Sequence, residues 1–131
     1  MPARGSRLAR PVRTDEWSIE AINGRAAEDW NKLAAVEPNA LAAAYDQLST
    51  NPVAVSSRQM RLKGSLATGT FEGRVFDRWQ YEVTAGGRIW YFADGPAEGG
   101  RRDPERKGRG PRPRRRVLIE AVSIGHPKAT E

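Results

Sequence analysis

The sequence contains no cysteine and only one histidine, and both scarcities exclude classes of function. Without cysteine there is no disulfide framework, no thiol nucleophile and no cysteine–zinc site. A single histidine with few clustered carboxylates also argues against a metal enzyme. No apolar run approaches the roughly 20 residues of a membrane span. The arginine-rich N-terminus is not followed by an apolar segment, so we expect no secretory signal, no membrane association and a cytoplasmic protein.

Positive charge is what the chain has in excess. It has 22 Lys and Arg against 16 Asp and Glu, a formal net charge of +6 over 131 residues. This balance favours a polyanionic partner such as RNA, DNA or an acidic protein. The length predicts one domain, residues 15–131, behind a disordered basic tail at 1–14. Residues 96–116 hold nine Lys or Arg and no apolar residue beyond Ala97, which predicts a flexible basic insertion.

Residues 78–95 have the clearest local pattern. Apolar and polar residues alternate over 79–84, as in a half-buried strand, and a second strand begins at Arg88. A three-residue turn at 85–87, with a glycine in the left-handed conformation, pairs Thr84 with Arg88; a two-residue turn would invert one strand. The three-residue turn gives an apolar face of Trp79, Tyr81, Val83, Ile89, Tyr91 and Ala93. The other face then carries Gln80, Glu82, Thr84, Arg88, Trp90 and Phe92.

Two helices are expected before this hairpin. Residues 17–22 alternate and predict a first strand, and Asn23 can cap a helix that runs to about Val36. Pro38 then starts a second helix to about Ser49, so the two form a helical hairpin.

The remaining segments predict further strands. Residues 60–66 suit a short edge strand, and 67–77 suit a loop in which 74–77 can begin the next strand. Residues 117–124 are apolar on both faces apart from Glu120, as in a central strand. The order strand, helix, helix, strand, strand, strand predicts an α+β fold, with an antiparallel sheet packed against the N-terminal helical hairpin.

This order and three short segments resemble the RelE/ParE superfamily of toxins from bacterial type II toxin–antitoxin systems. The segments are Leu62-Lys63-Gly64-Ser65-Leu66, Arg88-Ile89-Trp90-Tyr91 and Ile124-Gly125-His126-Pro127. The resemblance covers residues 17–131 and implies a RelE-like β-α-α-β-β-β fold. It implies translation inhibition by mRNA cleavage at the ribosome, without metal or other cofactor, and a cognate antitoxin as partner. The basic insertion departs from the family pattern.

Metal-free RNA cleavage needs a base for the 2′-hydroxyl, an acid for the 5′-oxygen and cations for the phosphate. The resemblance assigns the phosphate contact to Arg88 and the general acid to His126, whose ordinary pKa near 6.5 suits proton transfer. Glu82 shares Arg88's face and is the candidate base, with Glu72 as competitor. Each also has an ordinary interpretation, because arginines beside turns, histidines in Gly-His-Pro turns and solvated acids are common.

The candidate RNA contacts are basic or aromatic. Basic side chains would hold phosphates, and the aromatic rings of Trp90 and Phe92 on the polar face would stack on bases. Two other functions stay open: a ParE-like gyrase inhibitor, and a non-catalytic nucleic-acid-binding domain of the same fold. The candidates are Lys63, Arg74, Arg78, Trp90 and Lys128.

Overall fold

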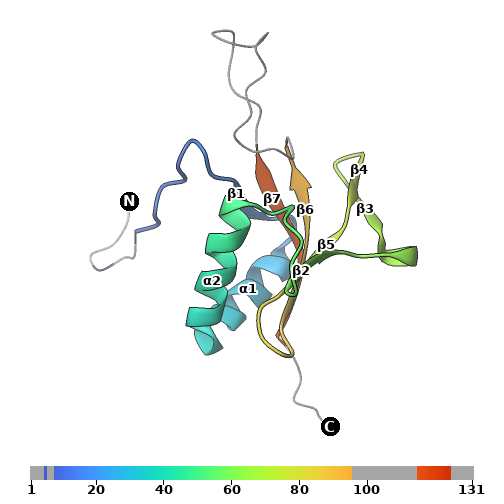
Figure 1. Cartoon of the computed structure of the whole chain (residues 1–131). Coiled ribbons are helices and arrows are strands. Elements are labelled where there is room, and N and C mark those ends of the chain that lie inside the picture. The colour runs from blue at the N-terminus through green and yellow to red at the C-terminus, as the bar shows by residue number, and fades with distance from the viewer. Residues whose placement is uncertain (1–4, 6–7, 96–114, 125–131) are drawn as a thin grey trace, which may run out of the picture.

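The computed structural model describes residue 5, residues 8–95 and residues 115–124. It has an α+β architecture of two helices, a five-stranded sheet and a two-stranded sheet (Figure 1). Among the described residues, no helix combines the length and apolarity that crossing a membrane requires. The elements are β1 (Ser18–Ala21), α1 (Gly24–Val36), α2 (Pro38–Thr50), β2 (Gln59–Arg61), the 3-10 turn η1 (Gly64–Leu66), β3 (Thr68–Phe71), β4 (Arg74–Asp77), β5 (Trp79–Glu82), β6 (Arg88–Asp94) and β7 (Arg116–Ser123).

The two helices begin where the sequence predicts. The Oδ1 of Asn23 accepts a hydrogen bond from the backbone N–H of Ala26 at 2.7 Å, which is an N-cap. Pro38 occupies the start of α2, where its missing N–H costs nothing. Glu37 alone separates the two helices. Their buried side chains face the main sheet: Ala26 and Leu33 from α1, and Leu41, Ala44 and Leu48 from α2.

The main sheet has the strand order β1-β7-β6-β5-β2. Three of its pairs are antiparallel, but β1 runs parallel to β7, so the expectation of a wholly antiparallel sheet is wrong at this pair. These are the first and last strands, and no tight turn links them, so nothing forces the antiparallel arrangement. The prediction that the last strand is covered on both faces is confirmed, because Val117 and Ile119 pack in the main core while Leu118 packs in a second cluster.

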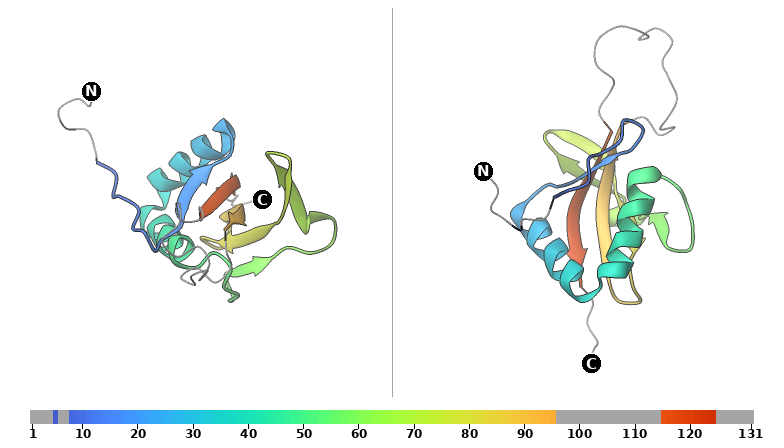
Figure 2. Two further views of the ribbon diagram at one scale, coloured as in Figure 1. Left: turned by 90° about the horizontal axis from the view of Figure 1, so that it is seen from above. Right: turned by 90° about the vertical axis from the view of Figure 1, so that its left-hand side faces the viewer.

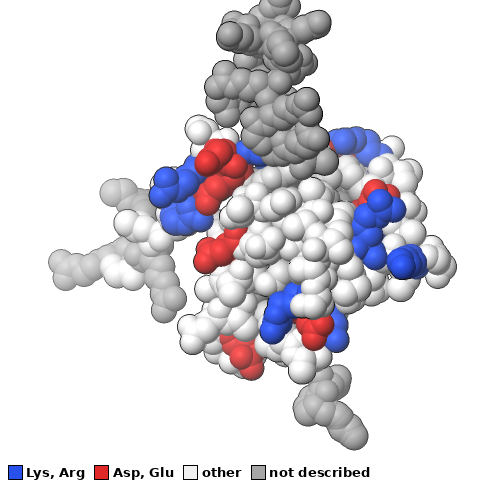
Figure 3. All heavy atoms as spheres, viewed as in Figure 1, with Lys and Arg blue, Asp and Glu red and all other residues white. Residues whose placement is uncertain are grey.

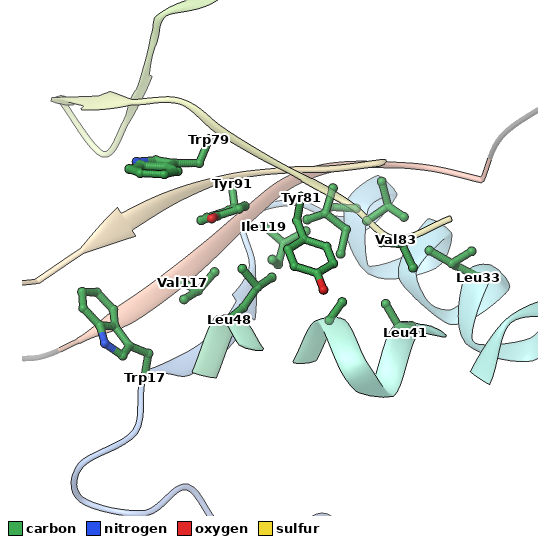
Figure 4. Close-up of a cluster of buried hydrophobic side chains, with 14 residues drawn as sticks. Trp17, Leu33, Leu41, Leu48, Trp79, Tyr81, Val83, Tyr91, Val117 and Ile119 are labelled. Carbon is green, nitrogen blue, oxygen red and sulfur yellow. The ribbon is translucent and has the colours of Figure 1, made fainter. Parts of the chain in front are cut away.

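The main core lies between the helices and one face of the sheet (Figure 4). Trp17, just before β1, is buried in it, and Leu33 of α1 is fully buried. The apolar face predicted for the hairpin is confirmed: Trp79, Tyr81, Val83, Ile89 and Tyr91 are buried in this core, and Ala93 packs against it.

The turn between β5 and β6 begins one residue earlier than predicted. Glu82, not Thr84, is the register partner of Arg88, and the N–H of Val83 donates to the carbonyl of Gly87 at 2.9 Å. The turn therefore comprises residues 84–86. Neither glycine at 86 or 87 has a positive φ, so the predicted left-handed glycine is wrong. The partner of Arg88 on β5 is therefore two residues away from the predicted one. Because side chains alternate with period 2, a shift of two leaves every residue on its predicted face.

Residues 68–77, expected as a loop in which 74–77 can begin a strand, form a second hairpin of β3 and β4; a strand at 74–77 is confirmed as β4, and β3 was not expected. Its two-residue turn, Glu72-Gly73, has positive φ at both positions (53° and 76°), as a type I′ turn requires. The hairpin and the helices lie on opposite sides of the main sheet (Figures 1 and 2). One face of the sheet is thus covered by helices, and the other face is only partly covered by this hairpin.

Candidate functional site

The sheet face turned away from the helices, which we call the outer face, carries the predicted site residues. Register places them in cross-strand rows. The covered half of this face lies under the β3–β4 hairpin and includes Phe92 and Leu118. The open half comprises two rows, Gln80–Trp90–Ala121 and Glu82–Arg88–Ser123.

The covered half is held together by apolar packing. Phe76 of β4 stacks on Phe92 of β6, with ring centroids 5.4 Å apart, and Leu118 completes this cluster. The backbone of β3 comes very close to the sheet at Gly69, because a Cβ there would stand 2.7 Å from Phe92 and 2.6 Å from the Nη2 of Arg78. Only glycine fits this approach.

Glu120 of β7 lies beside Arg78 on the outer face. Ala121 is the partner of Trp90 and Ile119 is the partner of Tyr91, so Glu120 is an extra residue in the ladder, a β-bulge. Both oxygens of Glu120 accept hydrogen bonds from Arg78, from Nε and Nη2, each at 2.7 Å. These hydrogen bonds raise the pKa of Arg78. Arg78, a predicted phosphate contact, is thus a paired and largely buried group.

A second ion network lies in the covered half, where β6 ends and β7 begins. Asp94 accepts from Arg116 at 2.6 Å and pairs with Arg74 at 3.0 Å. Burial alone would raise the pKa of Asp94, but these hydrogen bonds outweigh burial and hold its pKa below the ordinary value. Glu72, the competing candidate base, lies here, 3.5 Å from Arg116. The described contacts of Glu72 and Arg74 thus join them to this network.

In the open half, Arg88 is anchored to the turn beside it. Its Nη1 donates to the carbonyls of Thr84 and Ala85 at 3.0 Å each, and to that of Gly87 at 3.2 Å. No described residue accepts a hydrogen bond from its Nε or Nη2. Glu82 stands opposite, with its Oε2 3.9 Å from Nη1 and each side chain about one third exposed. The arrangement is a fixed guanidinium beside a carboxylate that is not hydrogen-bonded to it.

Trp90 lies in the neighbouring row and is only partly buried. Its Nε1–H donates to the Oε1 of Gln80, its register partner, at 2.9 Å. The guanidinium carbon of Arg78 lies 5.5 Å from the centroid of the indole. The prediction that Trp90 and Arg88 share a face with Glu82 and Gln80 agrees with this geometry.

The remaining predicted residues divide into two groups. Lys63 is exposed just before η1. His126 and Lys128 lie outside the described residues, as does most of the predicted basic insertion. Ile124, the last described residue after β7, lies near the Arg88 row, because a Cβ at Gly87 would stand 3.8 Å from its carbonyl oxygen. Sequence reasoning missed Glu120, Asp94 and Arg116 as partners; Glu120 had a signal, since it alone interrupts an apolar strand.

The described part of the chain has no excess of charge. It contains 12 Lys and Arg and 12 Asp and Glu, so the net +6 of the whole chain resides in the residues outside it. On the face seen in Figure 3 the basic and acidic side chains form small mixed groups, and no continuous basic patch appears among the described residues. A nucleic acid held by the described body alone would depend on particular contacts and little on overall attraction.

A pocket of about 180 Å³ lies on the opposite side of the sheet, between the helices and β1. No ionisable acid or base apart from Tyr45 lines it. It therefore offers little of the chemistry the predicted reaction needs. Its lining consists of Ile19, Ala21, Ala27, Trp30, Asn31, Tyr45 and Ile119.

Among the described residues, no group of three or more His, Cys, Asp or Glu side chains is placed to hold a metal ion. Among the described residues, the candidate site on the outer face consists of the guanidinium of Arg88, the carboxylate of Glu82 and the indole of Trp90. Comparison of the chain with protein-family models, with curated proteins and with solved structures gives no match.

Proposed function

We propose that this protein is a toxin-type endoribonuclease that cleaves mRNA without a metal, with the open half of the outer face as its RNA-contacting surface. The observation that carries the proposal is the pairing of Arg88 with Glu82 on an open surface, beside the strand that leads to His126. Cleavage would occur at the ribosome, and a cognate antitoxin would restrain it. A RelE-like topology is part of the proposal.

The chain order supports that topology. A first strand and two helices precede the strands β5, β6 and β7, and the helices cover one face of the main sheet (Figure 2). Between α2 and β5 the chain adds the edge strand β2 and the β3–β4 hairpin to the order that the resemblance implies. The hairpin covers part of the outer face and leaves the open half accessible.

Arg88 has the arrangement that a phosphate contact needs. Three carbonyls fix its Nη1, so the guanidinium does not have to be ordered when substrate binds. The described residues leave its Nε and Nη2 for two phosphate oxygens. In this mechanism Arg88 stabilises the charge that develops on the phosphoryl group.

Proton transfer falls to Glu82 and His126. Glu82 makes no hydrogen bond to Arg88, so its carboxylate is available to take the 2′-hydroxyl proton. His126 follows Ile124 by two residues, a length of chain that reaches about 7 Å. Because Ser123 is the register partner of Arg88, the segment that leads to His126 starts beside the proposed phosphate contact. His126 would protonate the 5′-oxygen as the bond breaks.

A second candidate, RNA binding without cleavage, is favoured by two observations. Two of the predicted basic contacts, Arg74 and Arg78, are already paired with Asp94 and Glu120. The described body is also neutral, so the basic residues outside it would supply most of the attraction to a polyanion. A binding protein needs only that attraction, whereas a nuclease also needs Arg88, Glu82 and His126.

The test is induction of the chain in bacteria, with RNA ends mapped in a translation extract. We expect growth arrest and new mRNA ends within codons, and we expect Arg88→Ala and His126→Ala to abolish both. Arg25→Ala is the matched control, because Arg25 is an exposed residue on α1 whose ion pair among the described residues is with its helix neighbour Asp29. The proposed nuclease activity would be contradicted by growth arrest with intact mRNA, by growth arrest with DNA breaks, or by full toxicity of both site variants.

A further inference from the structure

We propose that Trp90 is a stacking platform for one unpaired RNA base, placed next to the phosphate contact at Arg88. The inference rests on the proposed function for its ligand, single-stranded RNA, but it concerns binding and not the chemical step. It can therefore be tested apart from cleavage.

The indole of Trp90 is held in place before any ligand arrives. Gln80 accepts a hydrogen bond from its Nε1, which fixes one edge of the ring. Arg78 lies over the ring at 5.5 Å and is itself locked by two hydrogen bonds to Glu120. A ring that is already ordered loses little conformational entropy on binding, which favours affinity.

A comparison with Phe92 shows that Trp90 is not a core residue. Both lie on the same face of β6, two positions apart. Phe92 is completely buried and stacks on Phe76. Trp90 is partly exposed, and it belongs to none of the aromatic pairs among the described residues. Its register neighbour on β7 is Ala121, a small exposed residue, so no bulky side chain stands opposite the indole on that strand.

The position of Arg88 relative to Trp90 suits a nucleotide. Two positions along a strand are about 6.6 Å apart, which is of the order of the distance between a base and its own phosphate. A base on the indole thus brings its phosphate toward the guanidinium of Arg88. Every base has a π face, so this contact holds an unpaired nucleotide without selecting which base it is.

Binding of a 2′-O-methyl oligoadenylate of ten nucleotides tests the inference, because it lacks the 2′-hydroxyl nucleophile and cannot be cut. A chain of the same length without bases is the comparison ligand. We expect the purified full-length protein to bind the base-containing chain more tightly. Trp90→Leu should lower that affinity about 5- to 100-fold, the range of one lost stacking contact, and leave affinity for the abasic chain unchanged. Trp90→Tyr should retain most of the difference.

Two variants complete the design. Trp30→Leu alters a tryptophan on the helical side of the sheet and should leave both affinities unchanged. Gln80→Leu removes the edge hydrogen bond and should lower base-dependent affinity by a smaller factor. The inference is overturned if the wild type does not distinguish the two ligands, or if Trp90→Leu weakens both equally or neither. If the preference for bases depends on Trp90 but the protein leaves unmodified mRNA intact, the stacking inference holds and the proposed nuclease activity is contradicted.

Discussion

Trp90 and Phe92 lie on the same face of one strand, yet their surroundings differ completely. Phe92 lies under the β3–β4 hairpin and is fully buried, whereas Trp90 lies beyond the edge of the hairpin and stays partly exposed. Strand periodicity assigns them to the same face but cannot say what covers it. The hairpin therefore decides which half of the outer face is core and which is surface.

The ion pairs of the two halves differ in the same way. Arg78–Glu120 and Arg116–Asp94 in the covered half are short, at 2.7 and 2.6 Å, and their side chains are largely buried. Arg88 and Glu82 in the open half approach only to 3.9 Å and are more exposed. Basic residues near a predicted site thus serve two purposes. Some hold the hairpin on the sheet, whereas Arg88 is anchored by backbone carbonyls in the open half.

The largest effect on stability is expected from Phe92→Ala, which removes the centre of the covered half. Loss of a fully buried phenylalanine costs about 3–4 kcal/mol of unfolding free energy. Urea denaturation monitored by circular dichroism measures it. Val75→Ala is the control, since Val75 lies on the same hairpin with 71% of its surface exposed, and it should cost under about 0.5 kcal/mol. Equal costs for the two would show that the hairpin is not packed on the sheet.

Gly69→Ala tests the close approach of the hairpin to the sheet. The added methyl would meet the side chains of Phe92 and Arg78 at under 3 Å, so we expect a loss of about 2 kcal/mol. Gly24→Ala is the matched control, because a Cβ there meets nothing within 4 Å, and stability should not fall. A Gly69→Ala protein as stable as the wild type would mean that the hairpin lifts from the sheet at little cost.

Asp94→Asn tests the ion network through its pH dependence. Since the folded state holds the pKa of Asp94 below the ordinary value of 3.8, its contribution is fully present above that value and is lost as pH falls through the folded pKa. We expect Asp94→Asn to cost about 1.5 kcal/mol near pH 7, and the difference from the wild type to shrink below about pH 4.

The control for this titration is Asp77→Asn. Asp77 is half exposed and lies 3.7 Å from Arg61, so its loss should cost under about 0.5 kcal/mol. Thermal denaturation from pH 3 to pH 7 measures both variants. A constant difference between Asp94→Asn and the wild type over this range would contradict the role of the charged carboxylate.

Local patterns predicted much of this fold. The cap at Asn23, the helix stop at Val36 and the apolar face of β5 and β6 all follow from the sequence. The β3–β4 hairpin did not, because Glu72 supplies a left-handed turn position that asparagine or aspartate usually fills, and Gly69 suggested a break. Glycine there serves a tertiary contact, which no short window of sequence can reveal.

The site was predictable only as far as side-chain alternation extends. Alternation placed Glu82, Arg88 and Trp90 on one face even though the turn begins one residue early. It also placed Glu120 on the face of Leu118, two residues earlier, because the bulge changes the alternation only after Glu120, at Ala121 and Val122. It could not show that Arg78, 42 residues away in the sequence, is the partner of Glu120. Both ion pairs, Arg78–Glu120 and Arg74–Asp94, join residues that are far apart in the sequence. The charge of Arg78 and Arg74 alone therefore could not reveal that each already forms an ion pair within the protein.

The smallest stability effect is expected from Glu82→Gln in the open half. Its pair with Arg88 is 3.9 Å long and one third exposed, so the change should alter unfolding free energy by under about 0.5 kcal/mol. The variant keeps the shape of the side chain but cannot accept the 2′ proton, so the cleavage rate should fall at least about 100-fold. Glu72→Gln, in the covered half, should leave cleavage intact. If Glu72→Gln abolishes cleavage while Glu82→Gln does not, the base lies in the covered half and the division of the outer face is wrong.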